Sequence, residues 1–175
     1  KASIVISCLA SRTGTPKDAH LVDYQMNAAL LSKAQSISAE HFILLSAICV
    51  QKPRLAFQFE KLRFEDDLQA STLRYSIVRP TAYFKSLSGQ VKRIQNSKPF
   101  LVFGSGSETA CTPISERDLA NYLLDCIKDP TKWNRTLPIG GPKPALTPNA
   151  QAELMAGVFQ KPLKIKRILP KLFDR

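Results

Sequence analysis

Three apolar runs separated by helix-like stretches constrain the fold more than any other feature of the sequence. The runs are Ser3–Leu9, His41–Leu45 and Tyr75–Val78. Each is apolar throughout rather than alternating, which is typical of a strand buried on both faces of a sheet. The stretches between them, about Asp18–Ser36 and Leu55–Leu68, have helical composition and spacing. Single helices that alternate with buried strands predict a parallel sheet of βαβ units, and so an α/β fold.

The carboxyl ends of these strands indicate where a ligand would bind. In open parallel sheets, ligands bind outside the carboxyl ends of the strands. The segments that fall there are Ser7–Ser11, Ser46–Val50 and Pro80–Phe84, and they are rich in small and hydroxyl-bearing side chains. Such side chains let the backbone approach a ligand closely. We therefore expect these three segments to line a binding site.

One lysine interrupts an apolar face of the helix predicted over Leu55–Leu68. Phe57, Lys61, Phe64 and Leu68 recur at helical spacing and share this face. An ammonium in such surroundings needs an anionic or hydroxyl partner, or it gives up its proton. Two interpretations follow. Either the lysine stem covers apolar surface while its charge reaches water, or the side chain points into a cofactor crevice.

The same helix has a second apolar face, roughly opposite the first. It consists of Leu55, Phe59 and Leu62. A helix that is apolar on two sides is expected to be buried on two sides.

After residue 99 the pattern changes to short strands and turns. The strand Phe100–Phe103 is followed by Gly104–Gly106, and because residue 109 is Thr these glycines do not form a dinucleotide-binding GxGxxG motif. We expect a β-hairpin at this turn instead. The remaining predicted elements are helices over Lys85–Gln95, Ser115–Lys128 and Thr147–Phe159 and a strand over Asn134–Ile139.

The charge and cysteine content narrow the classes of partner. The net charge is +11, but no basic run alternates with aromatic residues and no helix-turn-helix or zinc-finger spacing occurs, so we predict no nucleic-acid binding. Phosphate or carboxylate ligands, or an acidic protein, suit this charge better. The four cysteines form no CxxC pair and only two histidines are present, so we predict no metal site. The basic segment Lys161–Arg175 is either a surface tail or a docking segment for a membrane face or partner.

Six segments carry a resemblance to a known family. They are Ser7–Arg12, Val22–Gln25, His41–Pro53, Tyr75–Leu87, Pro113–Leu119 and Leu137–Pro142. Together they resemble the NADPH-dependent 8-vinyl-reductases of plants, in the atypical branch of the short-chain dehydrogenase/reductase superfamily. The resemblance implies a Rossmann-like fold and a chloroplast location. It also implies reduction of the 8-vinyl group of divinyl chlorophyllide a, or a similar porphyrin, to ethyl with NADPH as the hydride donor.

The resemblance implies roles for residues at the predicted sheet edge. Lys61 matches the lysine of the superfamily's Tyr-x-x-x-Lys motif and would hydrogen-bond the nicotinamide ribose. Ser46 joins the residues expected to bind the cofactor. The expected adenine-side residues are Ser7, Cys8, Leu9 and Ala10, and those expected beside the nicotinamide are Pro80, Thr81, Ala82 and Phe84.

Phe57 stands where the superfamily has its tyrosine. A phenyl ring cannot donate a proton, so the usual acid is absent. Tyr83 is a candidate proton donor by position, with ordinary packing as the alternative. Lys61 and Tyr83 are therefore the candidate catalytic residues.

The family's Gly-rich phosphate loop has no counterpart in the sequence. Such a loop binds the pyrophosphate at a helix N-terminus, and none of the seven glycines opens a strand–turn–helix near the start. Lys1 falls at what would be the family's fourth strand. We expect a partial Rossmann-like parallel sheet, without the N-terminal strands and the phosphate loop, and a small C-terminal α/β substrate lobe. The expected domains are residues 1–99, the second half of an NADP-binding domain, and residues 100–175, a lobe that partly returns to the sheet.

Two alternatives to this reductase stay open. The first predicted strand would have an open apolar edge, which upstream sequence or another polypeptide must cover to prevent aggregation. With the phosphate loop and the tyrosine missing and a basic C-terminal segment present, the chain would also suit a non-catalytic subunit of a larger photosynthetic or respiratory complex. A different small-molecule reductase on the same fold is the other alternative.

Overall fold

The computed structural model describes residues 2–142 and 144–169, which form two compact units. Unit 1 comprises Lys1–Thr81 and Arg117–Ile139, and unit 2 comprises Ala82–Glu116 and Gly140–Arg175. The chain therefore enters each unit twice. The domain division expected after residue 99 stays a prediction, because compact units need not coincide with domains.

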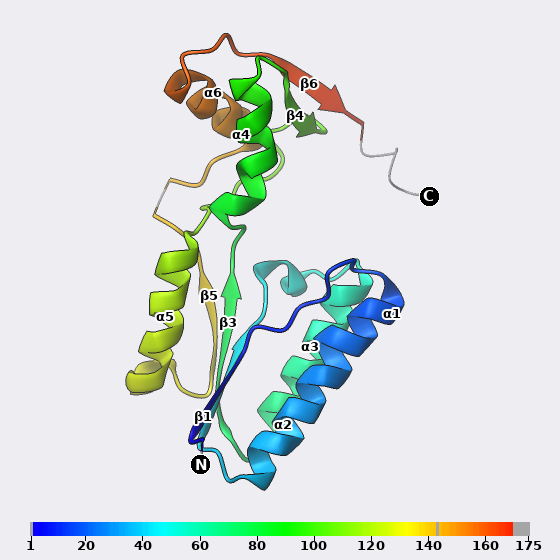
Figure 1. Cartoon of the computed structure of the whole chain (residues 1–175), viewed down its shortest axis with the longest axis vertical. Helices are drawn as coiled ribbons and strands as arrows, with labels where there is room; N and C mark the ends of the chain where they lie inside the picture. Colours follow the sequence, from blue (N-terminus) through cyan, green and yellow to red (C-terminus); the bar gives the residue numbers. More distant parts are fainter. Residues whose placement is uncertain (1, 143, 170–175) are drawn as a thin grey trace. The chain divides into compact units, whose positions relative to one another are not determined.

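Unit 1 is built on a parallel four-stranded sheet (Figure 1). Its strands are β1 (Ile4–Ser7), β2 (His41–Leu45), β3 (Arg74–Pro80) and β5 (Arg135–Ile139), in the order β1-β2-β3-β5. Every neighbouring pair is parallel. The first four residues of β2 are buried, as expected for a central strand covered on both faces. The predicted parallel α/β fold is confirmed.

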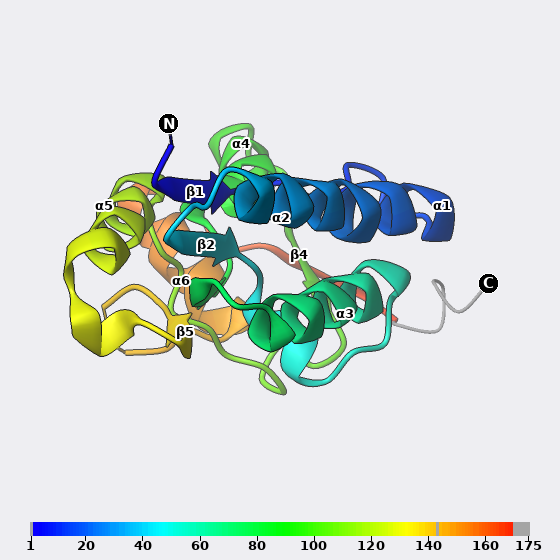
Figure 2. The ribbon, with the colours of Figure 1, turned by 90° about the horizontal axis from the view of Figure 1, so that it is seen from below.

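Helices cover both faces of this sheet (Figures 1 and 2). On one face α1 (Pro16–Ala19), the π-helical segment η1 (His20–Met26) and α2 (Asn27–Ser36) follow one another without a break. Helix α3 (Ala56–Ala70) lies beside them, and α5 (Glu116–Lys128) covers the opposite face. A π-helical turn inside a helix is rare and frequently occurs at functional sites. The long helix predicted between the first two strands is therefore present, with an unexpected π-helical part.

The core of unit 1 lies between the sheet and helices α2 and α3. Phe42, Leu44 and Ile77 of the strands pack with Phe64 and Leu68 of α3. The ring centroids of Phe42 and Phe64 are 5.9 Å apart. Full burial of one such side chain contributes about 1.5–3 kcal/mol relative to exposure, so this cluster holds α3 on the sheet. The first apolar face predicted for this helix is confirmed.

The second apolar face predicted for α3 is not buried. Leu55 is 56% exposed and Phe59 is 55% exposed, and Leu62 is only partly buried. Among the described elements, α3 packs against α1, η1, α2, η2 and β3 through its other face. The prediction of burial on two sides is wrong, because single apolar side chains on a helix surface are common and need no partner.

Unit 2 has a two-stranded sheet of its own. Strands β4 (Phe100–Phe103) and β6 (Ile165–Ile168) pack with helices α4 (Ser88–Gln95) and α6 (Pro148–Val158) around a small apolar core. The hydroxyl of Thr147 accepts the N–H of Ala150 at 3.2 Å and so caps the N-terminus of α6. The described residues also form short helical turns. They are η2 (Ile48–Gln51) and η4 (Pro130–Lys132) in unit 1 and η3 (Phe84–Leu87) in unit 2.

The hairpin predicted after β4 is wrong. Gly104 and Gly106 do have the positive φ of a turn, +66° and +77°, but β4 pairs in parallel with β6. Parallel strands need a long crossover, so local turn residues cannot reveal such a pairing. Strand β6 lies in the basic segment for which a tail or a docking segment was expected. Residues 170–175 of that segment lie outside the described residues.

His41, at the start of β2, is a buried histidine with one unpartnered nitrogen. Its Nε2 lies 3.0 Å from the Oγ of Ser76, which itself donates to the carbonyl of Lys132 at 2.8 Å. Nε2–H therefore donates to Ser76, and Nδ1 has no hydrogen-bond partner among the described residues. Burial, and then the charge of Arg74, lower the pKa of His41 below its ordinary value.

We predict that His41 makes the protein less stable in mild acid. Because its pKa is lower in the folded than in the unfolded state, the unfolded state binds more protons below about pH 6.5. The free energy of unfolding of the full-length protein should fall between about pH 7.5 and about pH 5.5, and His41→Gln should weaken this fall. Urea unfolding at several pH values measures both. His20→Gln, at a partly exposed histidine, is the control, and an unchanged pH dependence in His41→Gln would contradict the prediction.

Gly141, in unit 2, approaches a neighbouring backbone closely. Its N–H donates to the carbonyl of Thr112 at 2.8 Å. A Cβ at Gly141 would lie 2.0 Å from the carbonyl oxygen of Pro113, whereas a Cβ at Gly89 in α4 would meet nothing within 4 Å. A backbone carbonyl cannot turn aside as a flexible side chain does, so only glycine fits at position 141.

The two glycines give a matched pair of substitutions. Gly141→Ala should lower the free energy of unfolding by about 1–3 kcal/mol through overpacking. Gly89→Ala should raise it by up to about 1 kcal/mol, because alanine is the better helix former. Chemical denaturation of the full-length protein measures both changes. If the two substitutions shift stability in the same direction, the close approach at Gly141 is not the constraint we infer.

Candidate functional site

The predicted binding edge is formed by the ends of parallel strands in unit 1. Because β1, β2 and β3 are parallel, Ser7–Ser11, Ser46–Val50 and Pro80–Thr81 all leave the sheet at its carboxyl edge. Ala82, which begins unit 2, follows the last of these segments. The structure therefore brings together the predicted site residues of unit 1 at one edge.

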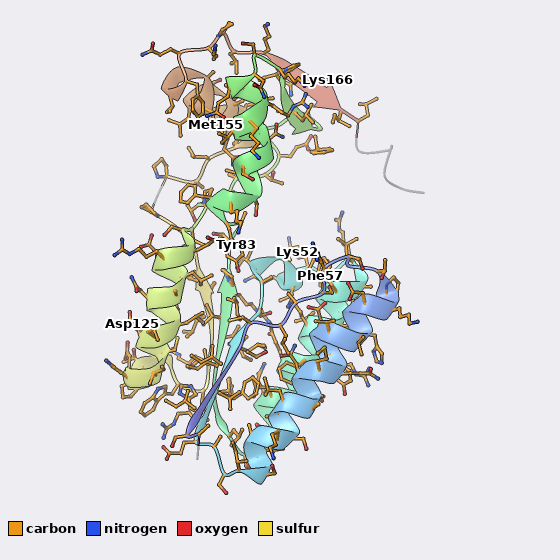
Figure 3. The ribbon with its side chains drawn as sticks, viewed as in Figure 1. Lys52, Phe57, Tyr83, Asp125, Met155 and Lys166 are labelled. Carbon is orange, nitrogen blue, oxygen red and sulfur yellow. The ribbon has the colours of Figure 1, made fainter. Side chains whose placement is uncertain are left out.

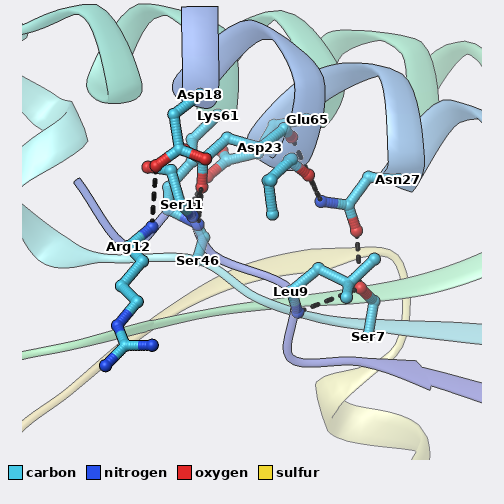
Figure 4. Close-up of polar contacts among 11 residues, drawn as sticks. Ser7, Leu9, Ser11, Arg12, Asp18, Asp23, Asn27, Ser46, Lys61 and Glu65 are labelled. Carbon is cyan, nitrogen blue, oxygen red and sulfur yellow. Dashed lines mark hydrogen bonds and ion pairs between the residues drawn. The ribbon is translucent and has the colours of Figure 1, made fainter. Parts of the chain in front are cut away.

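Lys61 has an anionic partner, which is one of the possibilities that the sequence left open. Its Nζ lies 2.9 Å from Oδ1 of Asp23, on the π-helical segment η1 (Figure 4). The side chain of Lys61 is 9% exposed and that of Asp23 is 0% exposed. The interpretation in which the lysine charge reaches water is therefore wrong. Lys61 is held inside the unit by a buried carboxylate.

Asp23 also binds the segment that follows β1. The backbone N–H of Ser11 donates to the same Oδ1 at 3.2 Å. The other oxygen, Oδ2, is buried and has no hydrogen-bond partner among the described residues. One carboxylate thus ties the Ser7–Ser11 segment to Lys61 and retains an unused acceptor.

Asn27 connects the end of β1 to the π-helical segment. Its Oδ1 accepts the hydroxyl of Ser7 at 2.5 Å, and its Nδ2 donates to the carbonyls of Val22 at 3.2 Å and Asp23 at 3.1 Å (Figure 4). The hydroxyl of Ser7 is therefore engaged within the protein. Ser7 therefore presents a ligand with a short side chain and a backbone that is fixed in position.

A second buried charged group lies at the ends of β2 and β3. Glu65 of α3, 1% exposed, accepts the hydroxyl of Ser46. Its Oε1 also accepts Nε of Arg79 at 3.3 Å, and its Oε2 accepts Nη2 of Arg79 at 2.5 Å. Ser46 is thus engaged internally, like Ser7. Bidentate guanidinium–carboxylate pairing fixes both groups in one geometry.

Asp18 shapes the loop between β1 and α1. Its Oδ2 accepts the N–H of Arg12 at 3.0 Å, the N–H of Thr13 at 2.8 Å and the hydroxyl of Thr13 at 2.7 Å. The hydrogen bonds from Thr13 are the main reason that the pKa of Asp18 lies below its ordinary value. A Cβ at Gly14 in this loop would lie 3.9 Å from the ring of Phe57, the residue that the resemblance sets at the position of the superfamily's tyrosine (Figure 3).

The remaining predicted residues belong to unit 2. Ala82, Tyr83 and Phe84 form a backbone pairing with Ile114: the N–H of Ile114 donates to Ala82 at 3.0 Å, and the N–H of Phe84 donates to Ile114 at 3.2 Å. Phe84 is 54% exposed. The pairing holds Tyr83 between two fixed neighbours, within its own unit.

Residues 1–130 match a family model described as NAD(P)H-binding. The chain belongs to this family. The matched part includes β1, β2, β3 and Lys61. The prediction of a nicotinamide cofactor is confirmed at the level of NAD(P)H.

Relatives of this NAD(P)H-binding chain match nearly its whole length. The divinyl chlorophyllide a 8-vinyl-reductase of Arabidopsis thaliana is 47% identical over 98% of this chain and 42% of that protein. The reductase of the same name from Zea mays is 48% identical over 97% of this chain and 43% of that protein. The photosystem II assembly factor Ycf39 of Trieres chinensis is 27% identical over 98% of this chain and 54% of that protein. The chain spans less than half the length of the two reductases, and the resemblance stated from its motifs is confirmed.

Solved structures of two other proteins share the fold. UDP-glucuronic acid 4-epimerase from Bacillus cereus, in complex with NAD, superposes with a TM-score of 0.83 at 14% identity, over 97% of this chain and 63% of that one. RMD from Pseudomonas aeruginosa, complexed with NADPH, gives a TM-score of 0.75 at 14% identity, over 95% of this chain and 68% of that one. The predicted Rossmann-like fold is confirmed.

The carboxyl edge of the sheet in this chain suits a nicotinamide cofactor. Cys8 and Ala10 are exposed after β1, and neither side chain is bulky or charged. The ammonium of Lys61 has three donors, so its contact with Asp23 does not exhaust it. Ribose hydroxyls can accept such donors, and a peptide backbone beside short side chains can approach them.

Sequence reasoning missed Asp23, Asn27, Glu65 and Arg79. A signal was present for three of them. Asp23 and Asn27 have helical spacing to the buried residues Leu31 and Ala34, and Glu65 is four residues from Lys61. Polar side chains on an inward face need partners, and this periodicity could have identified them.

The described residues contain no group of three or more His, Cys, Asp or Glu side chains placed to hold a metal ion. None of their helices is both long and apolar enough to cross a bilayer.

The Asp23–Lys61 pair should behave as a coupled unit. Asp23→Asn or Lys61→Met alone leaves a buried charge without its partner and should cost about 3–5 kcal/mol of unfolding free energy. The double variant should cost less than the sum of the two single variants, because it removes both charges. Urea unfolding of the full-length protein gives the coupling energy. Glu116→Gln, which breaks the exposed Lys85–Glu116 pair, should cost at most about 1 kcal/mol, and strictly additive effects at Asp23 and Lys61 would contradict the prediction.

Proposed function

We propose that this chain is part of an NADPH-dependent divinyl chlorophyllide a 8-vinyl-reductase that acts in the chloroplast. The observation that carries the proposal is its likeness to four plant proteins of that name, each called chloroplastic, at 47–53% identity over 86–98% of this chain. The proposed reaction converts the 8-vinyl group of the pigment to ethyl. NADPH is proposed rather than NADH on the family resemblance carried by the sequence motifs.

The chain's own residues would supply the position of the cofactor. When bound, NADPH provides the hydride, and a proton from another source completes the reduction. Lys61, fixed by Asp23 at 2.9 Å, would donate to a ribose hydroxyl. Ser7–Ala10 would pass along the adenine side of the cofactor, and Ser46 would border it. Because the hydroxyls of Ser7 and Ser46 are already bonded to Asn27 and Glu65, these serines would contribute backbone and shape.

The proton would come from outside the usual tyrosine position. Phe57 has no ionisable group, so it cannot serve as the acid. Tyr83 has a phenol and is held by the backbone pairing around Ile114, and we propose it as the proton donor. Pro80, Thr81, Ala82 and Phe84 would pass beside the nicotinamide.

A second candidate function is that of a non-catalytic assembly protein. It is favoured by the likeness to the assembly factors named Ycf39, at 27% and 25% identity. This likeness is much weaker than that to the reductases, so we place it second. A protein partner on the open edge of β1 and a peripheral membrane contact stay predictions.

Assay of the full-length protein with divinyl chlorophyllide a and NADPH tests the proposal. Conversion of vinyl to ethyl is expected, and Lys61→Met should lower kcat/KM by about 100-fold, since a misplaced cofactor is costly. Tyr83→Phe should lower kcat by about 100-fold or more if the phenol donates the proton. Lys33→Met, at an exposed lysine on α2, is the control.

Three results would count against parts of the proposal. Absence of conversion by folded full-length protein that binds NADPH would exclude the reductase and favour the assembly function. Full activity of Tyr83→Phe would exclude Tyr83 as the acid. An unchanged NADPH affinity in folded Lys61→Met would exclude the proposed cofactor contact.

A further inference from the structure

Unit 2 contains an apolar pocket whose lining shares Phe84 alone with the proposed cofactor site. It has a volume of about 260 Å³ and lies between η3, α4 and α6. Its apolar lining includes Phe84, Leu87, Val91, Leu154, Met155 and Val158. Met155 projects from α6 beside α4 (Figure 3).

The lining offers no hydrogen-bonding group to an occupant. Gln151 is the one lining residue with a polar side chain. Its amide donates to the carbonyl of Leu146 at 3.1 Å and to Sγ of Cys111 at 3.7 Å, and the residue is 7% exposed. The pocket is therefore suited to hydrocarbon or to the face of an aromatic ring.

Three large side chains of the pocket are held in contact with water. Phe84 is 54% exposed, Leu154 57% and Val158 68%. Leu154 and Val158 are one helical turn apart on α6, whereas Phe84 comes from η3, far away in sequence. Large exposed apolar side chains gathered around a concavity mark a binding surface. A ligand that covers all three would remove this unfavourable exposure.

The size and charge of unit 2 limit the kind of ligand. A pocket of about 260 Å³ is smaller than the roughly 300–1,000 Å³ that encloses a whole drug-sized ligand, so it takes one side of a larger molecule. The described basic side chains of unit 2 outnumber the acidic ones. They are Lys85, Lys92, Arg93, Lys98, Lys161, Lys164, Lys166 and Arg167, against Glu108, Glu116 and Glu153. The favoured ligand is therefore large, apolar and anionic.

Lys85 is the cation next to the pocket residue Phe84. Its Nζ lies 3.6 Å from Glu116 Oε1, and the two side chains are 77% and 65% exposed. Exposed pairs of this kind contribute little to stability. A ligand carboxylate could therefore replace Glu116 as the partner of Lys85 at little cost.

We propose that this pocket binds the apolar rim of a tetrapyrrole whose carboxylate is paired with Lys85. The inference rests on the proposed function for the identity of the ligand, and it adds the residues that bind it. The flexible thioether of Met155 can adjust to the edge of a flat ring and makes favourable contacts with aromatic systems. Phe84, Leu154 and Val158 cover the ring where it leaves the pocket.

Titration of the full-length protein with divinyl chlorophyllide a, without NADPH, tests the inference. Pigment fluorescence gives Kd. Leu154→Asp and Val158→Asp should each raise Kd about tenfold or more, since each places a charge against the ring. Lys85→Gln should raise it by a smaller factor and weaken its dependence on salt. Leu124→Asp is the matched control, because Leu124 is 54% exposed on helix α5 outside the pocket.

The variants separate this inference from the proposed function. NADPH affinity, measured in parallel, should be unchanged in Leu154→Asp and Val158→Asp. If either Asp variant loses its helical circular dichroism, Met155→Trp, which fills the pocket with apolar volume, should raise Kd in its place.

Three outcomes would overturn the inference. They are wild-type protein that does not bind the pigment, folded variants with the wild-type Kd, and a dimer that Leu154→Asp abolishes without changing Kd. The last would assign the surface to a second copy of the chain. Wild-type protein that binds the pigment through these residues but does not reduce it with NADPH would overturn the reductase proposal alone.

Discussion

The ion pair between Asp23 and Lys61 is the constraint on which the rest of the candidate site depends. Placing two charges inside a protein costs several kcal/mol for each ion before their attraction offsets it. The pair persists because helix α3 is fixed by Phe64 and Leu68, while the π-helical segment η1 presents Asp23. The same carboxylate holds the N–H of Ser11. The position of Lys61, the packing of α3 with η1 and the position of the loop at Ser11 therefore depend on one another.

The polar groups around this pair explain why small residues occupy the sheet edge. Ser7 and Ser46 place hydroxyls where Asn27 and Glu65 need hydrogen-bond partners. A larger side chain at either position would displace these buried groups and also block the approach of a ligand to the backbone. Packing and ligand binding thus both require small side chains at these two positions. For this reason, the strand-end segments predicted to bind a ligand also contain the serines that bond to Asn27 and Glu65.

How much could be predicted from the sequence depended on the range of the interaction. Buried strands are a local property and were predicted correctly. For Lys61 the sequence left open an anionic or hydroxyl partner, loss of the proton, or a charge that reaches water. It did not identify Asp23, because Asp23 is distant in sequence and reaches Lys61 only through the packing of η1 on α3. The hairpin predicted after β4 was wrong for the same reason, because the strand that pairs with β4 is β6, which is distant in sequence. The burial expected for Leu55 and Phe59 failed because apolar residues do not all find partners.

The two units differ in what they can specify. At 14% identity, a UDP-glucuronic acid 4-epimerase and the NADPH-bound protein RMD share the fold of this chain, so a parallel sheet with a nicotinamide edge cannot by itself determine the substrate. In unit 1, the buried polar groups hold Lys61 and the strand ends in place. Unit 2 has an apolar pocket, an excess of positive charge and Tyr83. On the proposed function, selection of the substrate and supply of the proton would fall to unit 2, and a change of substrate among relatives should then alter Phe84, Leu154 or Val158 before it alters Asp23 or Lys61.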